Sequence, residues 1–294
     1  MNKAHLYRMM AIVGLFLLMP NLFGTQNDLN PNNLLWRISG NELQTPSYLF
    51  GTIHVICADD FVAYEALEEK MGKTEKLMLE LNLQDPGLVM GLQMGMVMQD
   101  EKTIADLLSE EEYALVKQFF ADSLEMQISA VERVQPFFLV SMMFPHMLGC
   151  QPQSYEGYLM QLAAQKEIPL DGLETLQDQL DVFKKLTYEE QAGILMESLN
   201  DYAKSREEFR QLLDLYLSMD LEGMHQMSHE SLSQWEDFER SILKERNQRW
   251  IPRMEALMKE KPVFFAVGAA HLPGETGVLQ LLKDKGYTLE PLLD

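Results

Sequence analysis

Two short stretches of the same form, far apart in the chain, constrain its fold more than any other feature. Residues 262–271 read PVFFAVGAAH, an unbroken apolar run followed by a glycine and, three positions later, His271. Residues 48–54 read YLFGTIH and end in His54 in the same way. An apolar run of this length is typical of a strand covered on both faces of a sheet. We therefore predict two buried strands, each followed by a glycine and a histidine.

The two histidines are the first candidates for chemistry. Open α/β sheets bind ligands just beyond the carboxyl ends of their strands, which is where His54 and His271 are expected. The glycine before each histidine lets the backbone turn or approach a neighbour closely. Imidazole binds metals or transfers protons near neutral pH. We predict that both histidines meet at one cleft; the alternative is that each is an ordinary structural hydrogen-bonding residue.

Composition excludes several classes of function. The 294-residue chain is 47% hydrophobic and 23% charged, which is typical of a packed globular protein. Its formal net charge of -21 disfavours binding to nucleic acid or to an anionic lipid surface, because both need a basic surface. The acidity supplies carboxylates that can bind a cation. No GxSxG, P-loop or GxGxxG motif is present, which weakens the serine hydrolase, NTPase and dinucleotide-binding interpretations.

The chain has two cysteines, Cys57 and Cys150. They form no CxxC pair, so a thiolate zinc site is not expected. They could pair in an exported protein, and Cys57 lies close enough to His54 in sequence to line the site. The interpretation that we favour from sequence is two small, buried apolar side chains.

The N-terminus resembles an export signal. Lys3 and Arg8 precede an apolar run over residues 9–23, which suits a signal-peptide core and is short for a membrane span. Residues 1–24 are therefore predicted to be a signal peptide or a membrane anchor, and the polar residues 25–33 a linker. In either case the folded part lies outside the cytoplasm, in the periplasm or secreted.

Strands are expected at both ends of the folded part, around a mostly helical middle at about 88–253. Short strands bounded by turn residues are expected at residues 34–38, 48–50, 76–81, 168–173, 263–267 and 287–293. Helices are expected at residues 61–72 and 275–285, and capping boxes start two more at Ser109 and Thr187. This pattern predicts one α/β (α+β) domain over residues 34–294, with a central mixed sheet and a large helical insertion.

Glu80 stands out because it interrupts the apolar run LMLEL at residues 77–81. A carboxylate in a buried strand is costly unless it is paired or bound to a cation. Glu80 is therefore a candidate third ligand beside the two histidines, because two histidines and one carboxylate with open positions form many catalytic metal sites. The alternative is an edge strand with Glu80 in solvent.

Three further polar positions could take part. Glu174 follows a short apolar stretch and a glycine, and Glu156 precedes an expected helix at Gly157. Either could be an ordinary surface acid. Arg246, followed by Asn247, could orient a carboxylate or bind a substrate carbonyl, or form a surface salt bridge on a helix.

Two weaker candidates are set aside. His225 and His229 have the i, i+4 spacing of a helical zinc site, but the second histidine of HExxH is missing and the surroundings are polar. Residues 142–147, MMFPHM, are the one stretch that could supply an axial ligand to haem, and they fit a helix core equally well.

These motifs together resemble the TraB/PrgY/GumN family, which includes the animal Tiki proteins. The resemblance spans about residues 34–292, and the family usually has aspartate at the position of Glu156. It rests on the order of five segments, residues 48–54, 77–81, 172–175, 246–247 and the GAAHLPGE segment at 268–275. Tiki proteins are metal-dependent proteases that use the two GxxH histidines and a glutamate, so the resemblance implies His54, His271 and Glu80 as metal ligands. It also implies a fold like that of the erythromycin esterase and ChaN group.

The leading hypothesis is a divalent-metal-dependent hydrolase, most simply a peptidase, acting on a peptide or small-molecule substrate. The ion, Mn, Co or Zn, would lower the pKa of a bound water and polarise the substrate carbonyl. Glu174 or Glu156 would act as general base, and Arg246 would stabilise the oxyanion or hold the substrate.

Two alternatives stay open. One is a protein that binds and sequesters a peptide signal or a tetrapyrrole without turnover. The other is a metal-free hydrolase in which a histidine is the base.

Overall fold

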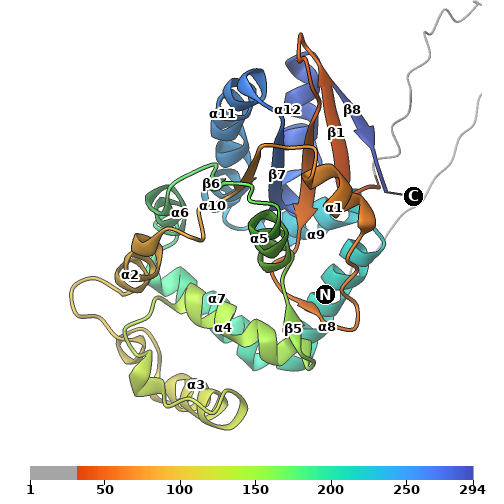
Figure 1. The fold of residues 1–294 in the computed structure, drawn as a ribbon. Coiled ribbons are helices and arrows are strands. Elements are labelled where there is room, and N and C mark those ends of the chain that lie inside the picture. The colour runs from red at the N-terminus through yellow and green to blue at the C-terminus, as the bar shows by residue number, and fades with distance from the viewer. Residues whose placement is uncertain (1–31, 294) are drawn as a thin grey trace, which may run out of the picture.

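A six-stranded mixed sheet forms the centre of the computed structural model, which describes residues 32–293 (Figure 1). The strand order is β6-β4-β7-β2-β1-β8; the first four are parallel neighbours, and β1 runs antiparallel to β2 and β8. The predicted α/β class with a mixed sheet built from both ends of the chain is confirmed. The strands are β1 (Leu35–Gly40), β2 (Ser47–Thr52), β4 (Lys76–Leu79), β6 (Leu170–Gly172), β7 (Val263–Gly268) and β8 (Tyr287–Pro291).

The two strands predicted from the repeated stretch lie side by side. Strand β2 is buried throughout and β7 is buried up to Gly268, as unbroken apolar runs in a central strand require. The strands pair in parallel with Thr52 opposite Gly268. Both therefore end at the same edge of the sheet, and the backbone delivers both histidine segments to that edge.

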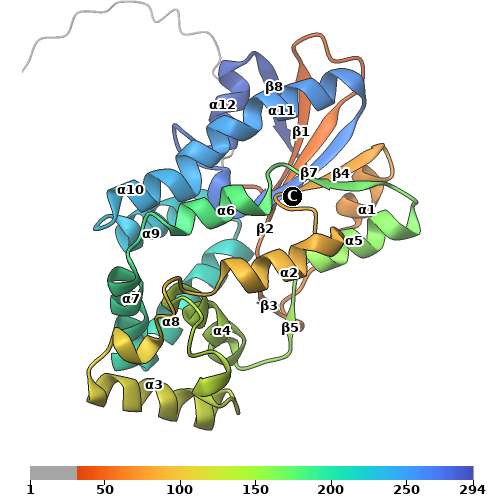
Figure 2. The ribbon, with the colours of Figure 1, turned by 90° about the vertical axis from the view of Figure 1, so that its left-hand side faces the viewer.

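Helices cover both faces of the sheet. Figure 2 shows α1 (Glu65–Met71) and α5 (Tyr155–Gln165) on one face, and α11 (Arg246–Glu260) and α12 (Val278–Asp284) on the other. The apolar residues of the strands and of these helices form one core. The predicted helix at 61–72 begins later, at Glu65. The one expected at 275–285 also begins later, at Val278, after a turn in which Gly274 has a φ of 81°.

The helical middle forms a second layer below the carboxyl edge of the sheet, with its own apolar core (Figures 1 and 2). Both predicted capping boxes are present, Ser109 with Glu112 and Thr187 with Glu190. The helices of this part are α2 (Pro86–Gly95), α3 (Glu110–Ser123), α4 (Pro136–Leu148), α6 (Leu176–Phe183), α7 (Tyr188–Asn200), α8 (Tyr202–Leu217), α9 (Leu221–Leu232) and α10 (Glu236–Glu239).

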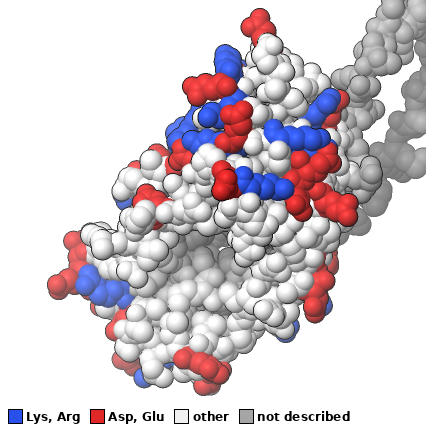
Figure 3. All heavy atoms as spheres, in the orientation of Figure 1, with Lys and Arg blue, Asp and Glu red and all other residues white. Residues whose placement is uncertain are grey.

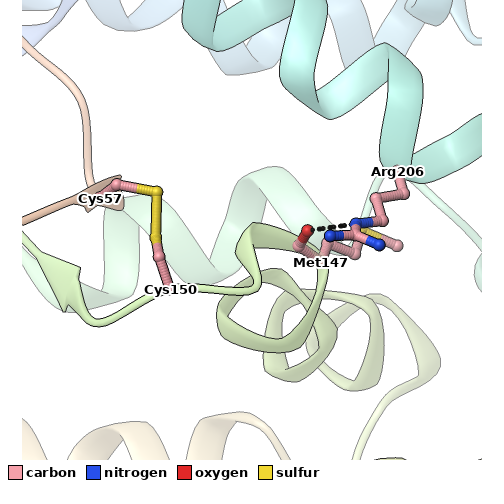
Figure 4. Close-up of a disulfide and its surroundings, with 4 residues drawn as sticks. All are labelled: Cys57, Met147, Cys150 and Arg206. Carbon is pink, nitrogen blue, oxygen red and sulfur yellow. Dashed lines mark hydrogen bonds between the residues drawn. A yellow bond between two sulfur atoms is a disulfide. The ribbon is translucent and has the colours of Figure 1, made fainter. Parts of the chain in front are cut away.

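The prediction of two free, buried cysteines is wrong. Cys57 and Cys150 form a disulfide, with their Cα atoms 5.7 Å apart (Figure 4). The pairing follows from a small antiparallel sheet, β3 (Ile56–Cys57) with β5 (Pro152–Gln153), that brings the two segments together. Local sequence could not decide between free and paired cysteines, because 93 positions separate the two residues.

The predicted leader, residues 1–24, and nearly all of the predicted linker, residues 25–33, lie outside the described residues. Within residues 32–293, none of the helices has the length and apolar character needed to cross a membrane.

Candidate functional site

A cavity of about 320 Å³ opens at the carboxyl edge of the sheet. Four of the six predicted site residues line it, namely His54, Glu80, Glu156 and Arg246. The other two, Glu174 and His271, lie directly behind Arg246 and are hydrogen-bonded to it. The structure therefore gathers all six predicted residues around one cavity, from six separate segments of the chain.

The pattern of hydrogen bonds fixes the tautomer of His271. Its Nε2 lies 3.0 Å from Nη1 of Arg246, which can only donate, so Nε2 is the acceptor. The proton is on Nδ1, which donates to Oδ1 of Asn247 at 2.6 Å. Asn247 is held in turn by donating to the carbonyl of Thr276 at 2.9 Å. Burial lowers the pKa of His271 to about 3, so the ring is neutral at physiological pH.

Arg246 is the centre of the buried part of the site. Its Nε and Nη2 donate to the carboxylate of Glu174, Nη2 also donates to Glu80, and Nη1 donates to the carbonyl of Ile242 as well as to His271. All five N–H donors of the guanidinium are therefore engaged. In this structure Arg246 holds two carboxylates and a histidine together, and it has no donor to spare for a substrate.

Glu174 is fully engaged and nearly inaccessible, with 3% of its side chain exposed. Besides Arg246, its carboxylate accepts from Nε1 of Trp250 at 3.1 Å and from Nε2 of Gln179 at 3.0 Å. The ring of Trp250 contacts the ring of His271 in a tilted arrangement, with ring centroids 4.5 Å apart. Glu174 is thus placed to position Arg246 rather than to reach the cavity.

Glu80 follows directly after β4, which is an inner strand between β6 and β7 and not an edge strand. Its side chain is largely buried. Burial alone would raise the pKa of Glu80, but the charge of Arg246 and the N–H of Gly268, which donates to Oε1 at 2.8 Å, outweigh it and leave the pKa far below its usual range. The carboxylate is therefore ionised, and its Oε1 lies 3.8 Å from Nε2 of His271.

His54 and Glu156 form a second hydrogen-bonded pair across the cavity. Nδ1 of His54 lies 2.8 Å from Oε1 of Glu156, which also accepts from Thr52 at 2.6 Å, while its Oε2 accepts from Ser154 at 2.8 Å. The hydrogen bond to Glu156 raises the pKa of His54 to about 9, although 71% of its side chain is open to the cavity. Burial would raise the pKa of Glu156, but the bonds from His54 and Thr52 lower it. The pair is ionic at neutral pH.

Glycine is needed at the two motif positions, Gly51 and Gly268, for different steric reasons. A Cβ on Gly51 would lie 3.2 Å from the backbone Cα of Ala269 and 2.7 Å from the side chain of Leu272, so glycine lets the two motif segments pack together. A Cβ on Gly268 would lie 3.3 Å from Oε1 of Glu80, on the side where its N–H holds that carboxylate. Each glycine therefore serves the assembly of the site.

The comparison with known proteins agrees with the motifs. A sequence model of the TraB/PrgY/gumN family matches residues 34–291. The chain belongs to this family.

Curated relatives of this TraB/PrgY/gumN protein carry the name metalloprotease. It is 24% identical to Metalloprotease TIKI2 of Danio rerio over 323 residues, which cover 90% of this chain and 62% of that protein. It is 25% identical to Metalloprotease TIKI1 of Homo sapiens over 332 residues, 91% of this chain and 64% of that protein. The chain thus spans about three fifths of the length of these relatives. No solved structure matches it, so the likeness to the erythromycin esterase and ChaN fold stays a prediction.

The names of these relatives imply a divalent ion, and the donor set of this TraB/PrgY/gumN protein can be tested for one. Within residues 32–293, no three His, Cys, Asp or Glu side chains are already grouped to hold a metal. However, two ligand atoms about 2.1 Å from a zinc ion at a tetrahedral angle lie about 3.4 Å apart, close to the 3.8 Å between His271 and Glu80. Nδ1 of both motif histidines is hydrogen-bonded, as in metal-ligating histidines, which use their other nitrogen for the ion.

The spacing of His271 and Glu80 is therefore compatible with a shared ion, with one condition. Nη1 of Arg246 now donates to Nε2 of His271, so this hydrogen bond and an ion on the same nitrogen exclude each other.

Several residues of the site could not be picked from sequence. Gln179 and Trp250 hold Glu174, and Ser154 and Thr52 hold Glu156. Thr52 lies inside a GxxH motif, which is a signal. Ser154 resembles an ordinary helix N-cap, and Gln179 and Trp250 resemble ordinary helix residues. A π-helical segment, Arg240–Glu245, directly precedes α11, and Arg246 donates to the carbonyl of Ile242 within it.

The weaker sequence candidates lie elsewhere. His229 is exposed and pairs with Glu239 at 2.6 Å, and His225 lies against Gly274 on the far side of the motif. Residues 142–147 belong to α4 in the second core.

A larger groove of about 1200 Å³ lies among α7, α8 and α9, but no predicted site residue lines it, so we assign the site to the smaller cavity. Cys57 lines a different pocket.

Proposed function

We propose that this protein is a divalent-metal-dependent hydrolase, and most specifically a peptidase. The observation that carries the proposal is the matched arrangement of the two motif histidines. Each follows one of two paired parallel strands, and each has its Nδ1 held by a neighbour, Glu156 or Asn247, so that Nε2 is the ligating nitrogen. The metalloprotease names of distant relatives support the same class.

In this proposal His54, Glu80 and His271 would hold the ion. Such an ion would supply a water of lowered pKa and would polarise the substrate carbonyl. The ionised state of Glu80 and the neutral state of His271 are the forms that bind a cation. The raised pKa of His54 means that it must lose its proton first, so ion binding weakens as pH falls below about 9.

Of the two predicted general bases, Glu156 is the better placed. It lines the cavity and is ionised, whereas Glu174 lies behind Arg246 with 3% of its side chain exposed. We propose that Glu156 accepts a proton beside His54, and that Glu174 and Arg246 act as positioning residues for Glu80 and His271. A role for Arg246 toward an oxyanion requires it to release one of its present acceptors.

A metal-free hydrolase is the second candidate, and one observation favours it. The guanidinium of Arg246 already places a positive charge against Glu80 and Nε2 of His271. In that mechanism Arg246 takes the electrostatic role of the ion, and the His54–Glu156 pair accepts and donates the proton.

The test measures metal content and cleavage together. The purified protein, never exposed to chelator, is assayed for bound metal and then offered a peptide library with and without EDTA. The proposal expects bound divalent metal and cleavage that EDTA abolishes and a divalent ion restores. Cleavage indifferent to EDTA would support the metal-free reading. Failure to cleave any peptide would contradict the peptidase assignment.

Three single variants locate the activity. His54→Ala and His271→Ala are expected to abolish cleavage. His229→Ala is the matched control because it removes an exposed histidine that also pairs with a glutamate, outside the cavity. Full activity in either of the first two variants would remove that histidine from the mechanism.

We also propose that the protein works outside the cytoplasm. The disulfide between Cys57 and Cys150 persists in oxidising compartments, and the N-terminal sequence has the features of an export signal. Fractionation of cells that express the full chain tests this. A cytoplasmic pool with both thiols free would contradict it.

A further inference from the structure

The cavity is lined by two chemically different groups of residues. The polar residues already described form one group, which we call its polar end. The other lining residues are all apolar, and we call them its apolar end: Leu79, Leu81, Leu83, Val182, Phe183, Ile242 and Ala266. The proposed reaction does not use this apolar end.

Every charged group that lines the cavity already has a partner. Glu80 is bonded to Arg246, and Glu156 is bonded to His54. A charged side chain placed at the apolar end would find no counter-ion there, and a buried, unpaired charge is strongly unfavourable. The cavity therefore selects for an apolar group at this end.

The apolar lining continues onto the outer surface. Among the described residues, six large apolar side chains are well exposed, and four of these lie between residues 83 and 94. We call these four the α2 surface; their exposed fractions run from 42% for Leu83 and 64% for Val89 to 67% for Met90 and 70% for Met94. Leu83 belongs to both the cavity lining and the α2 surface, so the two are continuous. Figure 3 shows a broad area with few charges, hollowed in the middle, on the face of the molecule that carries α2 and α4.

The packing of α2 explains why this surface is free. Gly91 and Gly95 face α6, where an added Cβ would lie 2.6 Å from Leu176 and 2.2 Å from Leu180. The glycines let α2 lie close against α6, and its larger apolar side chains point elsewhere. α6 itself supplies Gln179, Val182 and Phe183 to the cavity. The α2 surface is thus fixed relative to the polar end of the cavity.

We propose that the apolar end of the cavity and the α2 surface bind an apolar segment of a peptide substrate, with one bulky apolar side chain in the cavity next to the scissile bond. The volume of about 320 Å³ is at the lower limit for ligand pockets, which suits one side chain with its backbone. The α2 surface then receives further apolar residues on one side of that bond. This inference rests on the proposed function for the statement that the ligand is a peptide.

Binding and cleavage are measured separately, so that the two proposals can fail separately. A set of fluorescent peptides differs at one position only, which is Leu, Phe, Asp or Lys. Anisotropy gives the affinity of the His54→Ala protein for each peptide, and mass spectrometry gives the bonds that the unmodified protein cleaves. We expect the Leu and Phe peptides to bind at least about tenfold more tightly than the Asp and Lys peptides.

Variants of exposed residues test whether the peptide binds at the α2 surface. Leu83→Ser and the pair Met90→Ser with Met94→Ser are expected to weaken binding of the Leu peptide about fivefold to tenfold. All three side chains are exposed, so the fold tolerates these changes. Leu115→Ser is the matched control because Leu115 is also an exposed leucine, 37% accessible, on α3 away from the cavity. Its binding should equal that of the parent protein.

The outcomes separate the alternatives. Apolar preference in binding without any cleavage supports this inference and counts against the peptidase. Cleavage with equal or better recognition of Asp or Lys overturns the inference and leaves the peptidase standing. An effect of Leu83→Ser no larger than that of Leu115→Ser also overturns it. So does a finding that the α2 surface serves only vesicle binding or self-association, measured by flotation and sedimentation, while all peptides bind alike.

Discussion

The two GxxH motifs share one sequence pattern and end in opposite environments. His271 has 5% of its side chain exposed, is neutral, and is held by Arg246 and Asn247. His54 has 71% exposed, is protonated at neutral pH, and is held by Glu156. The motif therefore sets where a histidine lies on the sheet edge, whereas the neighbours contributed by other segments set its charge.

The two halves of the site are also held together by different means. The His271 half lies on the main core, between β4, β7 and α11, and its rigidity comes from packing and a buried ion network. The His54 half lies on a loop, where the disulfide and the small β3–β5 sheet tie the residues after His54 to the residues before Glu156. A covalent link therefore holds the His54 half in place, whereas packing holds the His271 half in place.

The largest effect should come from removing Arg246. Arg246→Met leaves Glu80 and Glu174 buried without their counter-ion, and we expect a loss of about 3–5 kcal/mol in the free energy of unfolding. Arg240→Met is the matched control, because Arg240 also pairs with two carboxylates but is exposed, and its loss should stay below about 1 kcal/mol. Urea denaturation measures both. Equal losses would show that the buried network does not hold the His271 half.

The next largest effect on stability should come from removing the disulfide. Replacing Cys57 and Cys150 together with Ser should lower the free energy of unfolding by about 2–4 kcal/mol. The same variant should bring the pKa of His54 down from about 9 toward its unperturbed value, because the link that holds it to Glu156 is gone. The pKa of His271 should stay low. NMR titration of both rings checks the comparison, and an unchanged pKa for His54 would show that the disulfide does not support the pair.

The histidines themselves should differ in their structural cost. His271→Ala leaves one N–H of Arg246 Nη1 and Oδ1 of Asn247 without a partner inside the core, so we expect a loss of about 2–3 kcal/mol in the free energy of unfolding. His54→Ala removes an exposed ring, and Glu156 keeps its hydrogen bonds from Thr52 and Ser154, so the variant should cost less than about 1 kcal/mol. Activity should be lost in both. Calorimetry of the two variants, with His229→Ala as the control, measures these losses of stability. Similar losses for His54→Ala and His271→Ala would show that the two histidines do not differ in their structural role.

The pH dependence of stability should separate the two histidines at opposite ends of the pH scale. The folded pKa of His271 lies below its unfolded value of 6.5, so the unfolded chain takes up a proton first as pH falls, and stability declines as pH falls from 6.5 toward 3. The folded pKa of His54 lies above 6.5, so its contribution is complete below 6.5 and is lost as pH rises through about 9. His271→Ala should flatten the acid side only, and His54→Ala the alkaline side only. A variant that flattens both sides would contradict the separation.

Local sequence was enough to predict the framework of the site. The apolar runs predicted β2 and β7, and the interruption of an apolar run predicted that Glu80 would need a partner or a bound cation; it is paired with Arg246. Those inferences use only neighbours in sequence, because strand burial and the cost of a buried charge are local properties.

The partners that tune the site could not be predicted in the same way. Asn247, Trp250 and Gln179 act through contacts that only the packed helices create, and the disulfide joins segments that no local pattern relates. The π-helical segment before Arg246 is a rare conformation that the sequence analysis did not predict. For the same reason, the sequence could not show that Glu174 is bound on both oxygens and Glu156 faces the cavity.

The central claim is that the two motif histidines, one buried and one open, serve a single ion. Titration of the ¹⁵N-histidine-labelled protein with Zn²⁺ at pH 8 tests it most directly, because NMR resolves Nδ1 and Nε2 of each ring. We predict that the Nε2 signals of His54 and His271 shift together, complete at one equivalent, and that His229 does not respond. Saturation of the two rings at different zinc concentrations, or a response from only one of them, would contradict the claim.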